Sequence, residues 1–155
     1  MADNSALAEF KQGINLLRNG YSAEAFEYLQ RAAKLEQYNP YYLSFLGISV
    51  ARAQRKWADA VNLCEIAVGL KRDEAQLYLN LAEVYVSAGR RDDAIQILDT
   101  ASTYCPANAR IKQMRGSLGR RSSPVLPFLG RAHFLNWSLG KLRHSALVRL
   151  RKSHN

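Results

Sequence analysis

The sequence predicts an all-α protein, built as a solenoid of three helix-turn-helix repeats with a capping helix and a basic amphipathic tail helix after them. Similar residues recur every 34 or 35 positions over most of the chain. Within each unit, apolar residues are spaced three and four apart, as on one face of a helix. We expect helices at about residues 5–18, 22–36, 41–54, 57–70, 74–88 and 91–104.

The third unit shows the repeat most clearly. It reads Tyr78-x-x-Leu81-Ala82-x-x-Tyr85, then Gly89, Ala94-x-x-x-Leu98, Ala101 and Pro106. The second unit reads Leu43-x-x-Leu46-Gly47-x-x-Val50, then Ala60-x-x-x-Cys64 and Ala67. The first unit reads Gly13-x-x-Leu16, then Gly20, Ala25-x-x-x-Leu29 and Ala32. The second unit differs by one extra residue before Lys56-Trp57.

Small residues recur where the two helices of a unit are expected to approach closely. They are Gly13, Gly47 and Ala82 on the first helices, and Ala25, Ala60 and Ala94 on the second helices. Larger side chains at these crossings would push the helices apart. One such pair of helices cannot cover its own apolar face, so the units are expected to stack.

Turn and cap residues fall between the expected helices. Asn39 and Pro40 read as an N-cap followed by proline in the first turn. Asp73 is expected to cap the first helix of the third unit. Gly20 and Gly89 can supply the positive φ that ends a helix.

These residues resemble the tetratricopeptide repeat. Three copies cover residues 5–106, as units of about 5–38, 39–73 and 74–106. The first copy lacks the aromatic residue of the first position. The resemblance implies a right-handed solenoid in which the first helix of each unit lines a concave groove. The groove positions carried onto this chain are Leu7, Phe10, Lys11, Ile14, Leu17, Arg18, Tyr41, Ser44, Phe45, Ile48, Arg52, Gln76, Leu79, Asn80, Glu83 and Ser87.

This groove is expected to be mostly apolar, with a few polar groups at its rim. Such a surface suits an amphipathic helix or an extended apolar peptide. The alternative is that many of these side chains pack between repeats. The family's clamp for the C-terminal carboxylate of heat-shock chaperones is not expected, because Lys11 and Asn15 lie one position out of its frame. The second unit also lacks the matching asparagine.

Positive charge is concentrated at the C-terminal end of the chain. The 155 residues carry a net charge of +9, yet residues 109–155 hold 11 Lys and Arg and no Asp or Glu. We expect a capping helix at 107–115, a linker at 116–130 and a tail helix at 131–152. Such a charge asymmetry favours a separate contact made by the tail.

The predicted tail helix has one apolar stripe and a basic face. Its candidate contact residues are Arg131, Trp137, Leu139, Lys141, Leu142, Arg143, Arg149, Arg151 and Lys152. A helix of this kind can bury its stripe against protein, including the groove of the same or a second copy. Through residues 120–152 it can also bind an anionic membrane or a nucleic-acid backbone.

No pattern in the sequence indicates catalysis. We find no nucleophile with a plausible base, no glycine-rich phosphate loop and no metal-spaced cluster. A non-enzyme without metal or cofactor is therefore expected. There is neither an apolar run of about 18 residues nor a secretory signal, so a cytoplasmic protein is the default.

The leading hypothesis is a protein-interaction scaffold or adaptor whose groove binds a peptide or helix, with the tail as a second attachment. One alternative is an adaptor anchored to a membrane or nucleic acid by its tail. Another is a chaperone of the bacterial secretion type with an apolar client, although the basic tail does not match the usual acidic balance of that class.

Overall fold

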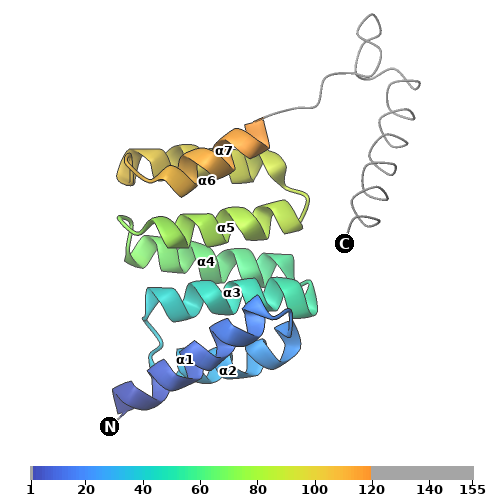
Figure 1. Ribbon diagram of the computed structural model, residues 1–155, viewed down its shortest axis with the longest axis vertical. Helices are drawn as coiled ribbons and strands as arrows, with labels where there is room; N and C mark the ends of the chain where they lie inside the picture. Colours follow the sequence, from blue (N-terminus) through green and yellow to red (C-terminus); the bar gives the residue numbers. More distant parts are fainter. Residues whose placement is uncertain (1, 120–155) are drawn as a thin grey trace, which may run out of the picture. The chain divides into compact units, whose positions relative to one another are not determined.

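The computed structural model describes residues 2–119, which form seven consecutive helices (Figure 1). They are α1 (Ala2–Arg18), α2 (Ser22–Leu35), α3 (Pro40–Gln54), α4 (Trp57–Leu70), α5 (Ala75–Ser87), α6 (Arg91–Tyr104) and α7 (Ala109–Gly119). The predicted all-α fold class is confirmed. The predicted tail helix, the remainder of the linker and all the tail contact residues lie outside the described residues.

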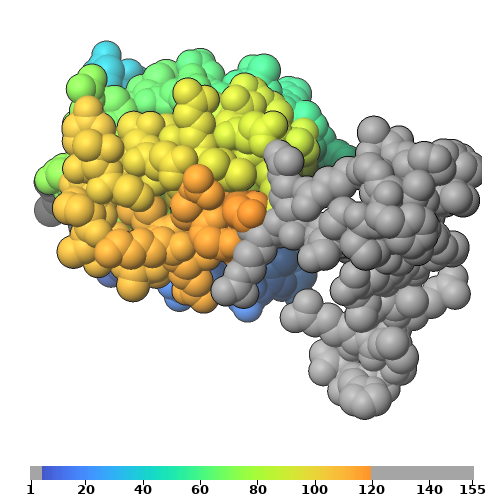
Figure 2. Space-filling view, turned by 90° about the horizontal axis from the view of Figure 1, so that it is seen from above, coloured from blue at the N-terminus to red at the C-terminus, as the bar shows by residue number. Residues whose placement is uncertain are grey.

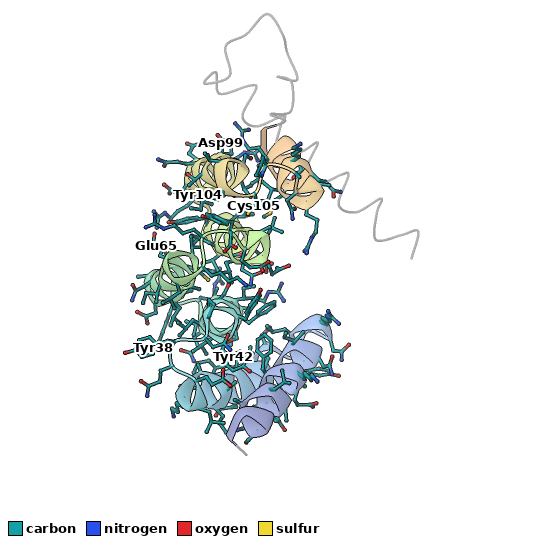
Figure 3. All side chains as sticks on the ribbon, turned by 90° about the vertical axis from the view of Figure 1, so that its left-hand side faces the viewer. Tyr38, Tyr42, Glu65, Asp99, Tyr104 and Cys105 are labelled. Carbon is teal, nitrogen blue, oxygen red and sulfur yellow. The ribbon has the colours of Figure 1, made fainter. Side chains whose placement is uncertain are left out.

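The helices form two layers. Figure 3, which looks nearly along the helix axes, shows α1, α3, α5 and α7 in one layer and α2, α4 and α6 in the other. Fully buried side chains from both layers make the core between them, including Leu29, Tyr78, Leu81 and Leu98. Each helix pair therefore covers the apolar face of its neighbour, as a repeat solenoid requires.

Two glycines allow the helices of a pair to approach closely. A Cβ on Gly13 would lie 2.6 Å from Leu29 Cγ in the facing helix α2. A Cβ on Gly47 would lie 2.6 Å from Cys64 Sγ and 2.9 Å from the carbonyl oxygen of Ala60. The predicted close crossings are thus confirmed at these positions, because no real side chain fits there without movement.

The turns within the pairs differ in a way that explains the extra residue of the second unit. Gly20 and Gly89 have φ values of 85° and 77°, as expected for glycines that end a helix. The second unit has no glycine at this place, and Arg55 adopts the left-handed conformation with φ 55°. Helix α3 continues to Gln54 before this turn, so the extra residue lengthens the helix and its turn rather than shifting α4.

Side-chain caps begin three of the first-layer helices. The Oδ1 of Asn39 accepts from Tyr41 N at 3.1 Å and begins α3, as predicted. The prediction for Asp73 is wrong. Glu74 is the N-cap of α5, and its carboxylate accepts from Gln76 N. Asn108 caps α7 through Arg110 N at 3.0 Å.

The last helix lies beside α6 at the end of the stack, as Figure 2 shows from that end. Ile111 is fully buried there, as expected of a capping helix. The helix runs to Gly119, four residues beyond the predicted boundary at Arg115. It continues because Leu118 packs against the core, while Arg115 Nε pairs with Asp99 at 2.6 Å.

Candidate protein-binding groove

The first-layer helices α1, α3, α5 and α7 line a cavity of about 410 Å³ that is open to solvent. It is lined by Ile14, Leu17, Arg18, Phe45, Ile48, Arg52, Gln76, Asn80, Glu83 and Arg110. Nine of these ten residues are groove positions in the sequence analysis. The geometry thus brings side chains from three repeats together around one hollow, which we call the central cavity.

Arg110 is the lining residue that the sequence analysis missed. It comes from α7, which lies beyond the three recognised repeats. The repeat spacing in the sequence could have identified Arg110, because it follows the groove residue Gln76 by 34 residues, the period of the repeat. Helix α7 therefore occupies the place of a fourth first-layer helix and contributes the same groove position.

Apolar side chains line the part of the central cavity next to α1. Phe45 and Ile14 are half-buried there. Phe10 does not line the cavity but supports its wall. Its ring meets the Phe45 ring edge-on at 5.5 Å and the Tyr42 ring at 4.6 Å. This aromatic cluster holds Phe45 in place while leaving part of its surface open to an occupant.

A chain of hydrogen bonds, the polar ladder, crosses the cavity floor from α3 to α7. Asn80 Nδ2 donates to Ser44 Oγ at 2.9 Å, and Gln76 Nε2 donates to Asn80 Oδ1 at 2.6 Å. Arg110 completes the ladder by donating to Gln76 Oε1 at 2.8 Å. Ser44 and Asn80 are almost fully buried, so these bonds satisfy groups that would otherwise be costly to bury.

Arg52 connects three helices at the rim of the cavity. Its guanidinium donates through Nε to Glu83 Oε1 on α5 at 3.1 Å. It also donates through NH1 to the Leu17 carbonyl near the end of α1 at 3.4 Å. One side chain on α3 thereby links its two neighbouring first-layer helices.

The electrostatic character of the cavity differs from the mostly apolar groove that was predicted. Three arginines and a single carboxylate line it, and that carboxylate, Glu83, is paired with Arg52. Among residues 2–119, the Arg18 side chain makes no hydrogen bond or ion pair, and the Arg110 guanidinium donates only to the neutral Gln76 side chain. Two positive charges in the central cavity are therefore uncompensated by its lining.

A second hollow of about 330 Å³ adjoins the first toward α7. It is lined by Gln76, Leu79, Asn80, Glu83, Arg110, Gln113, Met114 and Ser117. Four of these residues also line the central cavity. The concave surface is therefore continuous from α1 to α7.

Several of the groove positions are buried, and others lie outside both hollows. Ser44, Ile48, Leu79 and Asn80 are buried, because α3 and α5 pack closely enough to bury them between helices. Lys11, Ser87 and Leu7 are exposed and line neither hollow.

Tyr41 joins two repeats instead of facing the cavity. Its hydroxyl donates to the Glu74 carboxylate and accepts from Lys71 Nζ at 3.3 Å. The hydrogen bond to Glu74 raises the pKa of Tyr41 above its ordinary value. This contact ties the start of α3 to the start of α5 and stabilises the stack.

Reactive groups are not concentrated at the groove. Cys64 is fully buried beneath it, and burial raises the pKa of its thiol to about 12, which makes it a poor nucleophile. Within residues 2–119, no three His, Cys, Asp or Glu side chains gather to hold a metal ion. No helix in this range is long and apolar enough to cross a membrane.

Comparisons with known proteins identify the architecture. The profile of the tetratricopeptide repeat family matches residues 51–118. No curated protein matches the chain. The first such domain of Spaghetti (RPAP3), solved with an HSP90 peptide SRMEEVD, is 19% identical with a TM-score of 0.63. The match covers 74% of this chain and 93% of that one.

Two further structures are similar. The second domain of human RPAP3, solved with the HSP70 peptide SGPTIEEVD, is 16% identical with a TM-score of 0.64, covering 78% of this chain and 100% of that one. A thermophilic protein of the same repeat family from Thermus thermophilus is 20% identical with a TM-score of 0.65, covering 73% of this chain and 63% of that one. At these identities the structures share the fold with this chain.

Proposed function

Because the chain is a tetratricopeptide-repeat protein, we propose that it is a non-catalytic interaction module that binds a peptide or helix of another protein in the groove between α1 and α7. The observation that carries the proposal is the central cavity, which is open and has Ile14 and Phe45 on its wall. A large apolar side chain placed there would remove apolar surface of both molecules from water.

The likeness to the RPAP3 domains supports peptide binding in general. The mode of binding proposed here is different from the chaperone clamp. Lys11 and Asn15 are exposed and lie one position outside the register of that clamp, and the half-buried Phe10 and Ile14 occupy the register instead. We therefore propose an apolar anchor, not a terminal carboxylate, as the main recognition element.

The proposal is tested by selecting binders from a library of random peptides with the full-length protein. Phe45→Ala or Ile14→Ala should each reduce peptide binding by about fivefold or more, because they remove apolar area from the wall of the cavity. Tyr38→Ala is the matched control. Tyr38 is 81% exposed and lies beside the second layer (Figure 3).

Circular dichroism of each variant separates lost binding from lost folding. Selected peptides that bind the Phe45 and Ile14 variants as tightly as the wild type would show that the groove is not the binding site. Peptides whose binding depends on Tyr38 instead would place the site on the opposite layer.

We propose that residues 120–155 add a second attachment. They carry eight Lys and Arg and no Asp or Glu, a composition that suits an acidic surface. Binding to vesicles containing anionic lipid and to duplex RNA should fall steeply as salt rises. Replacing Lys141, Arg143, Arg149 and Arg151 by Gln should weaken whichever binding is observed. Full retention by that variant would refute a role for the tail.

A further inference from the structure

We infer that the occupant of the groove is an acidic segment of another protein, which seats an apolar side chain on Ile14 and Phe45 and places carboxylate side chains beside Arg18 and Arg110. This inference rests on the proposed function and specifies the chemistry of the partner. It concerns a carboxylate within a chain, not a chain terminus.

The distribution of charge supports it. The described residues are nearly balanced, with 14 Lys and Arg against 13 Asp and Glu. The central cavity is not balanced, since three arginines and only Glu83 line it. The Glu83 carboxylate is already paired with Arg52, so the charges of Arg18 and Arg110 remain available to a carboxylate of the partner. Charge complementarity of this kind selects partners and speeds their association.

The geometry of Arg110 also fits this role. The polar ladder holds its guanidinium through one hydrogen bond to Gln76 Oε1 at 2.8 Å. A guanidinium has five N–H donors, so others remain for a carboxylate while the ladder stays intact. Because Arg18 belongs to α1 and Arg110 to α7, a segment that crosses the groove meets an arginine from each end of the described stack.

The same charges argue against the chain's own C-terminal residues as the occupant. Residues 120–155 bring eight basic side chains and no Asp or Glu to a cavity that already has two uncompensated arginines. An acidic partner is attracted by both the groove and these residues. The observations therefore favour a separate acidic protein over self-association through the groove.

The test uses the full-length protein and a random peptide library in which each peptide is fused at its C-terminus, so that no peptide offers a terminal carboxylate. Selection is run on the wild type and on Arg18→Gln/Arg110→Gln. The control is Lys56→Gln/Arg72→Gln, which removes the same charge at exposed positions that line neither hollow. All three proteins keep residues 120–155, so attraction to that segment cancels in the comparison.

We expect wild-type binders to combine a large apolar residue with nearby Asp or Glu. Changing that acid to its amide in a synthetic peptide should weaken binding to the wild type and to the control by about threefold to tenfold. The Arg18→Gln/Arg110→Gln protein should bind both peptides equally. Arg18→Gln alone leaves the polar ladder intact, and it should lose part of the preference for the acidic peptide over its amide. Because the ladder is unchanged in this variant, that effect would not come from a folding defect.

Two results would overturn the inference. Binders that depend on Phe45 but are not enriched in acid would refute it while leaving the proposed function in place. The same conclusion follows if the double variant still prefers the acidic peptide. If no peptide binds in a manner that depends on Phe45, both the inference and the proposed function fail.

Discussion

Substituting alanine for Gly47 tests what sets the distance between the helices of the second repeat. The new Cβ would lie 2.6 Å from Cys64 Sγ and 2.9 Å from the Ala60 carbonyl oxygen. The thiol can rotate, but the carbonyl belongs to the backbone of α4 and moves only with that helix. Such overpacking costs about 1–3 kcal/mol. Alanine gains about 1 kcal/mol over glycine as a helix former, so the net loss is about 0–2 kcal/mol.

Gly69→Ala is the matched control, because it makes the same change in α4 where a Cβ meets nothing within 4 Å. It should stabilise the protein by about 1 kcal/mol or less. The free energies of unfolding of the two full-length variants should therefore differ by about 1–3 kcal/mol. Urea unfolding monitored by circular dichroism measures this difference. Equal stability of the two variants would refute the claim that Gly47 is required by close contact.

Three further predictions concern caps, pH and thiols. Asn39→Ala removes the cap of α3 and should lower the free energy of unfolding by about 1 kcal/mol in the same urea assay; an unchanged midpoint would contradict this. Burial and the hydrogen bond to Glu65 raise the pKa of Tyr85 to about 12. The pKa of tyrosine in the unfolded chain is about 10. Tyr85 therefore makes its full contribution to the free energy of unfolding below about pH 10, and this contribution is lost as the pH rises toward about 12. Tyr85→Phe should flatten this alkaline decline, and an identical decline would contradict the assignment. A thiol reagent should modify the half-buried Cys105 well before the fully buried Cys64, and equal rates in the native protein would contradict the packing.

Local signals in the sequence predict the helices well. Gly20, Gly89 and Asn39 act within a few residues of their own position, so their roles follow from the sequence alone. The cap of α5 does not follow in this way. Asp73 and Glu74 are both acidic and adjacent, and Glu74 has the additional tertiary contact with the Tyr41 hydroxyl that no local pattern reveals.

The candidate groove could be predicted only in outline. Helical periodicity identifies which residues share the concave face, and nine of them surround the central cavity. The burial of Ser44 and Asn80 depends on the separation of α3 and α5, which the sequence does not specify. The basic character of the cavity could not be anticipated without Arg110, whose helix lies outside the recognised repeats.

The left-handed turn at Arg55 shows where this architecture tolerates insertions. The second repeat is longer than its neighbours, yet Gly47 still meets Ala60 and Cys64 in the facing helix. Alignment of the two helices is therefore governed by their crossing point and not by the length of the hairpin that joins them. A short insertion at this bend is therefore expected to leave the crossing of α3 and α4 at Gly47 in place.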